Sequence, residues 1–210
     1  CDRRQRQMCI RDRFNALPKR VCNQHKFSDY ADYLHENLPA QAELDLQREK
    51  PLNPAPLVSV AIACSGASRA AVRSTLEALG KQTYANFEVC VVSELAQAGL
   101  TDYEGIPKFR LVLFNGTAHE QLKAAEKMLN GAYFLQLLPG DLPAPDALHM
   151  LVLQTHANPE AEVVFADEDS VIDGIRQNPI FKPDYGRDTL RSFNSCLLYT
   201  SPSPRDTERS

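Results

Sequence analysis

The sequence predicts an α/β protein with a doubly wound, mostly parallel sheet. Short apolar runs rich in β-branched residues, such as LVSVAIAC at 57–64, are typical of strands buried on both faces of a parallel sheet. These runs alternate with segments of helical spacing across short loops. This alternation predicts right-handed crossovers, with helices covering both faces of the sheet.

The two ends of the chain differ from its middle. Residues 1–13 and 196–210 are rich in Arg, Ser and Pro and lack the periodicity of core-forming elements. Both resemble translated sequencing-adaptor read-through, in RQMCIRDR and LLYTSPSPRD, and natural disordered tails are the alternative. We therefore exclude both ends and expect a natural segment at 14–195, cut short at its C-terminal side.

Charge, hydropathy and cysteine placement narrow the class of protein. Of the net charge of −4, the first thirteen residues contribute +3 and the last fifteen contribute none, so residues 14–195 carry −7. This charge argues against a nucleic-acid partner. Cys64 and Cys90 lie in apolar runs, so we expect buried thiols, neither nucleophiles nor a disulfide. With no visible membrane span or signal peptide, the segment is predicted to be soluble and cytoplasmic, and an anchor in a missing part stays open.

Within this segment we expect a helical preface and linker at 14–55 and one domain at 56–195. The preface helix at 27–39 has Ser28 or Asp29 as its N-cap, and the start of the linker is helical until Pro51. In the domain, Ser68 is the expected N-cap of the first helix, and Gly80 and Gly131 are expected at helix ends. The predicted strands lie at 57–64, 87–93, 109–114, 132–138 and 162–166, and the predicted helices at 68–80, 118–130 and 145–156.

Ligands of such sheets bind at the carboxyl ends of the strands. Backbone amides at the first strand end and acids at later ones suit a nucleotide diphosphate bridged to Mg²⁺ or Mn²⁺. The alternative is that the acids cap the helices that follow. In chain order the strand ends carry Ser65-Gly66, Ser93-Glu94, Asn115-Gly116, Pro139-Gly140-Asp141 and Asp167-Glu168-Asp169.

The order and spacing of several motifs carry a resemblance to a known family. QTYANFEV (82–89), the block GAYFLQLLPGDLPAPDAL and the block DEDSVIDGIRQNPIFKPD follow one another after the first strand, PLVSVAIACSG. Together they resemble family-2 glycosyltransferases of the GT-A fold, in particular bacterial enzymes that build rhamnan, O-antigen and similar surface polysaccharides. The resemblance runs from about Tyr30 to about Asn194.

The resemblance implies a reaction and its partners. A UDP- or dTDP-sugar donor would pass its sugar, with inversion, to a glycan or lipid-linked glycan acceptor deprotonated by a carboxylate base. A divalent cation, Mg²⁺ or Mn²⁺, would sit on a DxD-type loop that aligns with 139–141, so Asp141 is the expected metal ligand. The base is expected beyond Ser195. The implied location is the cytoplasm, including the cytoplasmic face of the membrane, in association with the inner membrane or other transferase domains.

Further site residues follow from the same resemblance. Asp167 and Asp169 are the catalytic candidates, which would hold hydroxyl groups or support the metal shell, with capping of a turn or helix as the alternative. The donor-binding candidates are Ala63, Ser65, Glu94 and Lys182, and a solvated lysine is the alternative for Lys182.

Three departures from the family pattern keep a second function open. Pro139 replaces the first acid of the DxD loop, and Ser93-Glu94 stands where a pair of Asp is usual. The first strand ends in Ala63-Cys64-Ser65-Gly66 in place of a Pro-containing turn. These changes suit either a different donor mode or a degenerate, non-catalytic GT-A-like domain that binds glycan or serves as a scaffold. Another class of nucleotide binder is a weaker alternative, because no Gly-rich phosphate loop follows the first strand.

Overall fold

The computed structural model describes residues 30–94, 106, 108–161, 163–180 and 200–202. The chain divides into two compact units, which we describe separately. The sheet unit comprises residues 41–164 and 197–210, and the hairpin unit comprises residues 1–40 and 165–196.

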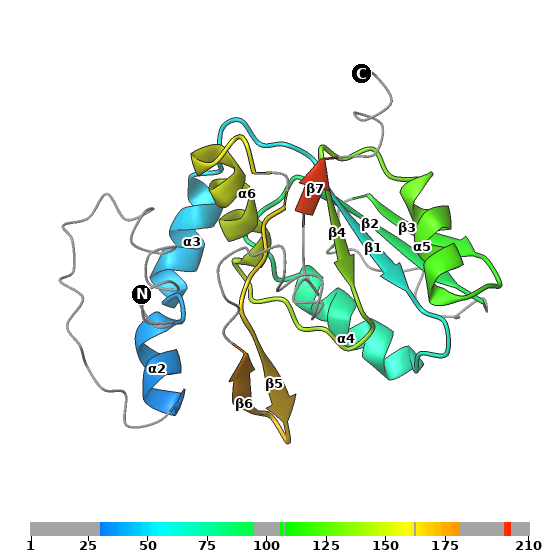
Figure 1. Cartoon of the computed structure of the whole chain (residues 1–210). Coiled ribbons are helices and arrows are strands. Elements are labelled where there is room, and N and C mark those ends of the chain that lie inside the picture. The colour runs from blue at the N-terminus through cyan, green and yellow to red at the C-terminus, as the bar shows by residue number, and fades with distance from the viewer. Residues whose placement is uncertain (1–29, 95–105, 107, 162, 181–199, 203–210) are drawn as a thin grey trace. The chain divides into compact units, whose positions relative to one another are not determined.

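A five-stranded sheet forms the centre of the sheet unit, in the order β3-β2-β1-β4-β7 (Figure 1). The central strand β1 (Val58–Ala63) pairs in parallel with β2 (Phe87–Ser93) and with β4 (Tyr133–Leu137). Strand β3 (Phe109–Leu113) extends the parallel sheet beyond β2. The predicted α/β class with a mostly parallel sheet is confirmed, and the order 3-2-1-4 is that of a Rossmann-type half.

Helices cover both faces of this sheet, because the side chains of β1 alternate between two cores. Val58, Val60 and Ile62 belong to a cluster with buried residues of α4 (Arg69–Leu79) and α6 (Ala147–Ala157). Ala61 belongs to a smaller cluster with residues of β2 and with Ala125 of α5 (Ala118–Glu126). Every residue of β1 and β2 is buried, which explains the continuous apolar runs of the sequence.

Side-chain caps define where the helices begin. Ser68 accepts a hydrogen bond from the Ala71 amide at the start of α4, as predicted. Thr117 and Glu120 form a capping box at the start of α5. These hydrogen bonds from the Thr117 amide and hydroxyl lower the pKa of the Glu120 carboxyl. The predicted C-cap at Gly131 is wrong, because α5 ends at Glu126 with Lys127 as its C-cap.

Gly131 has a packing role in place of a capping one. Its amide donates to Ser59 Oγ at 2.8 Å, and a Cβ there would lie 2.5 Å from that oxygen and 2.7 Å from the Leu57 carbonyl. Ser59 Oγ in turn donates to Glu88 Oε1 at 2.7 Å, and the Asn130 amide donates to the same oxygen at 2.6 Å. The buried Glu88 carboxylate also lies 3.7 Å from Arg110 Nη2. This network fastens the turn before β4 to the first residues of β1 and β2.

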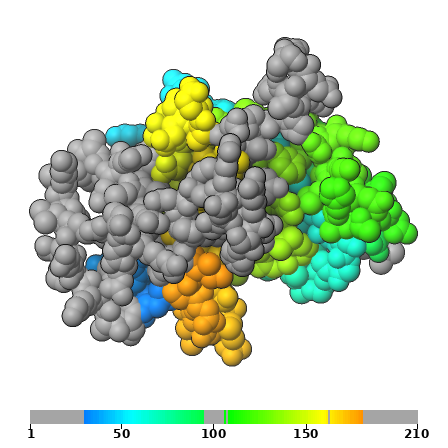
Figure 2. Space-filling model, viewed as in Figure 1, coloured from blue at the N-terminus to red at the C-terminus, as the bar shows by residue number. Residues whose placement is uncertain are grey.

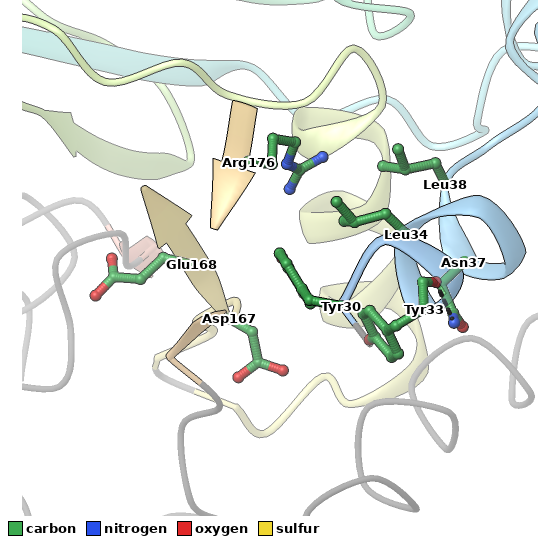
Figure 3. Close-up of a pocket in the computed structure, with 8 residues that line it drawn as sticks. All are labelled: Tyr30, Tyr33, Leu34, Asn37, Leu38, Asp167, Glu168 and Arg176. Atoms are coloured by element: carbon green, nitrogen blue, oxygen red, sulfur yellow. Dashed lines mark hydrogen bonds between the residues drawn. The ribbon is translucent and has the colours of Figure 1, made fainter. Parts of the chain in front are cut away.

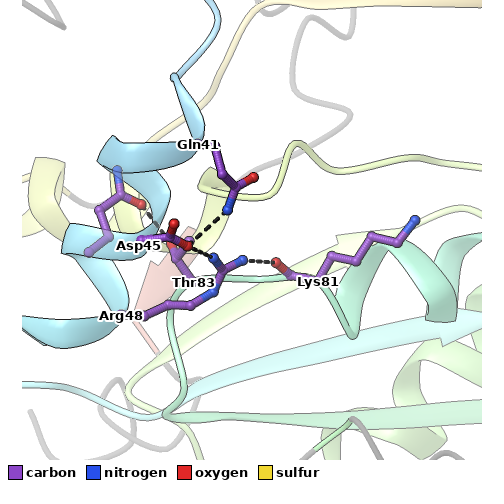
Figure 4. A network of polar contacts seen from close by, with 6 residues as sticks. Gln41, Asp45, Arg48, Lys81 and Thr83 are labelled. Atoms are coloured by element: carbon purple, nitrogen blue, oxygen red, sulfur yellow. Dashed lines mark hydrogen bonds and ion pairs between the residues drawn. The ribbon is translucent and has the colours of Figure 1, made fainter.

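Helix α3 (Gln41–Glu49) belongs to the sheet unit, although its sequence lies in the predicted linker. Asp45 Oδ1 accepts from Gln41 Nε2 at 2.8 Å and from Arg48 Nη1 at 2.9 Å (Figure 4). Arg48 Nη2 donates to the Lys81 carbonyl, and Thr83 Oγ1 donates to Gln47 Oε1 at 2.7 Å. These contacts join α3 to the turn that follows α4.

The hairpin unit contains α2 (Tyr30–Asn37) and the antiparallel strands β5 (Glu168–Ile172) and β6 (Ile175–Ile180). The predicted N-cap of the preface helix, Ser28 or Asp29, lies outside the described residues. The predicted strand at 162–166 is wrong, because the described residues there form an isolated bridge at Val164. Asp173 and Gly174 have φ of 53° and 77°, so they form a tight turn that pairs the segments on either side of it.

A short strand, β7 (Thr200–Pro202), pairs antiparallel with β4. It lies inside the C-terminal segment that we expected to remain outside the fold. Its pairing partner is the edge of the parallel sheet, where unpaired backbone groups of β4 accept another strand. The origin of residues 196–210 stays a prediction.

The surface of the sheet unit is formed in part by its helices. In the space-filling view, described residues of α4 and α5 both reach the surface (Figure 2). Among the described residues, no helix combines the length and hydropathy required to cross a bilayer.

The contacts of Gly131 give a test of the fold. Gly131→Ala should lower the free energy of unfolding by about 1–3 kcal/mol, because the new Cβ has no room beside Ser59 and Leu57. The matched control is Gly80→Ala, where φ is −62° and the nearest atoms lie at 3.6 Å. That change should leave stability unchanged or raise it by up to about 1 kcal/mol. Chemical denaturation followed by circular dichroism measures both, and equal stability of the two variants would contradict the packing described.

Candidate functional site

The carboxyl ends of β1, β2 and β4 lie at one edge of the sheet because the three strands are parallel neighbours. Ala63 ends β1 at this edge, and the loops that leave the edge contain three more of the predicted site residues, namely Ser65, Glu94 and Asp141. We refer to this edge and its loops as the carboxyl edge.

The loops after β1 and β2 meet through a side-chain contact. Ser65 Oγ donates to Glu94 Oε1 at 3.3 Å in an exposed position. Gly66 follows with φ of 69°, and no atom lies within 4 Å of the position where a Cβ would be. Ala63 is the last residue of β1, and its side chain is buried. Only its backbone could therefore contact a ligand.

The loop after β4 is held in a defined conformation by α4. The Gly140 amide donates to Thr75 Oγ1 at 2.9 Å and to the Ala71 carbonyl at 3.1 Å. Gly140 has φ of 102°, a conformation that favours glycine. Because α4 begins directly after the β1 loop, one helix fixes the positions of the β1 and β4 loops at the carboxyl edge.

Asp141 closes the β4 loop on itself. Its Oδ2 accepts from the Leu138 amide at 2.7 Å, and its own amide donates to the Leu138 carbonyl at 3.0 Å. Oδ2 of Asp141 therefore orders the turn. The same hydrogen bond fixes the position of the whole carboxylate, including Oδ1.

The donor set of this edge restricts the kind of cation site. Within the described ranges, no group of three His, Cys, Asp or Glu residues is placed to hold a metal ion. The described residues therefore do not fit a cation held by the protein alone. Asp141 fits a cation that takes one protein carboxylate and completes its shell with phosphate oxygens and water, as Mg²⁺ often does.

The two catalytic candidates, Asp167 and Asp169, lie in the hairpin unit. We expected both residues at the end of a sheet strand at 162–166, but that strand does not form. Asp167 instead precedes β5, and Asp169 lies within β5. Asp169 Oδ2 accepts from Tyr30 Oη and from Arg176 Nε, each at 2.6 Å. Burial, and then the hydrogen bond to Asp169, raise the pKa of the Tyr30 hydroxyl well above its usual range. Lys182 lies outside the described residues.

Cys64 and Cys90 are buried free thiols, as predicted. Burial raises the pKa of each thiol to about 11. Both are therefore protonated near neutral pH, which excludes them as nucleophiles.

Sequence reasoning missed three residues that order these sites. Thr75 shares the buried face of α4 with Val72 and Leu76, so helical periodicity assigns it to the core without indicating its bond to Gly140. Tyr30 and Arg176 both donate hydrogen bonds to Asp169. Tyr30 is 139 residues away from Asp169 in the sequence, and Arg176 is seven residues away. The Asp173-Gly174 pair was the available signal for this pairing, because such a dipeptide between apolar runs favours a hairpin.

Comparison with known sequences finds two relatives, and no family model matches the chain. The protein y4gI of Sinorhizobium fredii, itself uncharacterised, is 32% identical over 148 residues, which are 66% of this chain and 16% of that protein. The O-antigen biosynthesis protein RfbC of Myxococcus xanthus is 26% identical over 176 residues, which are 80% of this chain and 14% of that protein. The chain thus spans less than one fifth of either relative.

Comparison with solved structures finds distant likenesses. Residues 1–349 of TarS from S. aureus match over 51% of this chain and 34% of that one, with 18% identity and a TM-score of 0.45. The mannosyltransferase PcManGT of Pyrobaculum calidifontis, in complex with GDP-Man and Mn²⁺, matches over 58% and 40%, with 22% identity and a TM-score of 0.45.

The buried thiols lead to a prediction about reactivity and pH. At pH 8, alkylation by iodoacetamide should spare Cys64 and Cys90 in the folded protein and reach them after denaturation, as mass spectrometry of peptides would measure.

The same burial makes stability depend on pH. The pKa of both thiols is 9.0 when exposed and about 11 when folded, so the unfolded state loses these protons first. Stability from the two thiols is complete below pH 9 and falls as the pH rises to about 11, by about 2 kcal/mol per thiol.

The double variant Cys64→Ala/Cys90→Ala is the control for this pH dependence. Its free energy of unfolding should fall less steeply between pH 9 and pH 11 than that of the unchanged protein. Rapid alkylation of either thiol in the folded state would contradict the burial described.

Proposed function

We propose that the chain is part of a glycosyltransferase that moves a sugar from a nucleotide-diphosphate donor to a glycan acceptor, with metal assistance and inversion. The observation that carries the proposal is that α4 positions two loops at one edge: the helix begins after the β1 loop, and it accepts both hydrogen bonds of the Gly140 amide from the β4 loop. The carboxyl edge carries the Ser65 hydroxyl, the Glu94 carboxylate and the Asp141 carboxylate, which is ordered by the Leu138 amide. Such an edge suits a nucleotide diphosphate that binds together with a divalent cation, because the cation lies between the phosphates and a carboxylate.

The sequence comparison supports the same class of reaction. The likeness to RfbC covers 80% of this chain, and that protein acts in O-antigen biosynthesis. The motifs that resemble family-2 glycosyltransferases lie in the same part of the chain. A surface polysaccharide is therefore the acceptor class that we favour.

The residues of the carboxyl edge have separate roles in this proposal. Ser65 would donate to the donor nucleotide, and Glu94 would accept from its base or ribose, since the two side chains meet in an exposed hydrogen bond of 3.3 Å. Gly66 would let the backbone approach the diphosphate closely. Asp141 would supply one ligand to Mg²⁺ or Mn²⁺, which when bound neutralises charge on the leaving diphosphate.

A second candidate function is a non-catalytic domain that binds glycan or supports a neighbouring transferase domain. Two observations favour it: one oxygen of Asp141 is already used within its own turn, and the described residues offer no group of three metal-ligating side chains. Nucleotide binding separates the two functions, because a scaffold needs none.

Substitutions at Asp141 test the proposed donor site. Calorimetric titration with UDP and with dTDP, each in the presence of Mn²⁺, should show binding to the unchanged protein. Asp141→Asn should weaken it at least tenfold, because the amide oxygen can still accept from Leu138 while the charge that attracts the cation is lost. Without Mn²⁺, the two proteins should bind UDP equally.

The control is Glu126→Gln, which removes a charge from the end of α5. It should bind UDP with Mn²⁺ as the unchanged protein does. Equal binding by Asp141→Asn in the presence of Mn²⁺ would contradict the role of Asp141. Folded protein that binds neither nucleotide would favour the non-catalytic function.

A further inference from the structure

The hairpin unit contains a cavity of about 120 Å³ between α2 and the segment that begins at Asp167 (Figure 3). At roughly 30 Å³ per water molecule it has room for about four waters, so it takes in one face of a sugar ring and leaves the rest of the ring outside. All of the described residues that line it belong to the hairpin unit. None of them is among the predicted site residues of the carboxyl edge.

One wall of the cavity is aromatic. Tyr30 and Tyr33 stand one turn apart on α2, and their rings stack with centroids 5.8 Å apart and planes 13° from parallel. Both line the cavity together with Leu34 (Figure 3). The face of an aromatic ring carries partial negative charge, so it attracts the weakly positive C–H groups on the flat face of a pyranose.

Polar groups of both signs complete the lining. Asn37 donates through Nδ2 to the Tyr33 carbonyl at 2.8 Å, and its side-chain carbonyl is an acceptor by chemistry. Arg176 brings guanidinium donors, and Asp167 brings carboxylate acceptors. Donors and acceptors mixed beside an apolar face suit hydroxyl groups, each of which both donates and accepts.

Formal charge among the described residues disfavours an anionic ligand. Of these residues, Asp167, Glu168 and Asp169 bring three negative charges to this region and Arg176 brings one positive charge. Arg176 is also paired with Asp169 at 2.6 Å, so its charge is largely compensated. A phosphate or carboxylate would meet net repulsion, whereas a neutral polyol would not.

The polar frame holds the aromatic wall in place before a ligand arrives. Tyr30 Oη and Arg176 Nε both donate to Asp169 Oδ2, and the side chain of Asp169 is 9% exposed. These two bonds tie the first residue of α2 to both strands of the hairpin. A ligand that stacks on Tyr30 therefore meets a ring whose orientation is already fixed.

We propose that this cavity binds one neutral pyranose ring of a glycan, stacked on Tyr30 and hydrogen-bonded by Asn37, Asp167 and Arg176. The identity of this glycan as the acceptor rests on the proposed function, whereas the binding of a pyranose does not. Asp169 is a positioning residue in this site because it acts through Tyr30 and Arg176.

Saturation-transfer NMR on the full 210-residue chain tests the proposal without nucleotide. The probes are methyl α-D-mannopyranoside, methyl α-L-rhamnopyranoside and methyl α-D-glucopyranoside, with α-D-glucose 1-phosphate as the anionic counterpart. At least one neutral glycoside should bind with a dissociation constant on the order of 1–10 mM, the range for one small neutral ligand. Glucose 1-phosphate should bind at least tenfold more weakly than that glycoside.

Variants of one tyrosine separate stacking from hydrogen bonding. Tyr30→Leu should weaken glycoside binding at least tenfold, and Tyr30→Phe, which keeps the ring, should remain within about threefold of the unchanged protein. The matched control is Tyr133→Leu in β4, which lies in the sheet unit and should leave glycoside binding unchanged. Should Tyr30→Leu fail to fold, Asn37→Ala provides the second test, with an expected loss of about fivefold.

Three results would overturn the proposal: no signal from any neutral glycoside, binding unchanged in Tyr30→Leu and Asn37→Ala, or preference for glucose 1-phosphate. The UDP titration with Mn²⁺ keeps this test separate from that of the proposed function. UDP binding without glycoside binding contradicts this inference alone. Glycoside binding without UDP binding contradicts the donor site alone and leaves the pyranose site supported.

Discussion

The parallel pairing of β1 with neighbours on both sides is the constraint on which the sheet unit depends. All six residues of β1 are buried, and its backbone pairs with β2 on one side and β4 on the other. Val58, Val60 and Ile62 each contribute about 1.5–3 kcal/mol through burial, and their alternation with Ser59 and Ala61 gives each face of the sheet its own core. With the strand direction fixed, the loops after β1, β2 and β4 must leave from the same edge.

The two edges of this sheet serve different purposes. At the amino-terminal edge, Glu88 is enclosed and accepts hydrogen bonds from Ser59 and from the Asn130 amide, so its charge is used within the fold. Removing one partner of a buried charge is costly, so this network stabilises the amino-terminal edge. At the carboxyl edge, Ser65, Glu94 and Asp141 stand on loops held from behind by α4 and by strand pairing. Rigid support behind exposed polar groups is the arrangement that a binding site requires.

The sequence was sufficient to predict β1 to β4 and α4 to α6 of the sheet unit because their apolar patterns are strong, whereas β7 was not predicted. The apolar run at 57–64, Ser68 as an N-cap and the buried cysteines all agree with the structure. The errors arose where pairing over long sequence distances decides the outcome. The apolar run EVVFA has the composition of a strand, but the turn at Asp173-Gly174 places the pairing later in the chain. Gly131 follows a helical pattern, where a glycine often caps the helix. Its close contacts with Ser59 and Leu57 are distant in sequence, so the residues next to Gly131 in the chain do not predict them.

The candidate sites were predictable to a similar, partial extent. The rule that ligands bind at carboxyl ends of parallel strands located Ser65, Glu94 and Asp141 without any side-chain geometry. The same rule wrongly predicted Asp169 at the end of a sheet strand. In the structure Asp169 belongs to the hairpin unit, where its carboxylate accepts hydrogen bonds from Tyr30 and Arg176. Stacked rings on α2 facing a hairpin residue depend on tertiary contacts, which no local pattern encodes.

Binding of a nucleotide diphosphate with its cation at the carboxyl edge would bring the cation close to the β1 and β4 loops. Residue-by-residue NMR of the isotope-labelled chain with UDP and a trace of Mn²⁺ tests it most directly, because the paramagnetic ion broadens nearby amide signals. We expect the broadening to centre on Gly140 and Asp141, to extend to Ser65 and Gly66, and to require UDP. Broadening centred on the hairpin unit, or equal broadening with and without UDP, would contradict it.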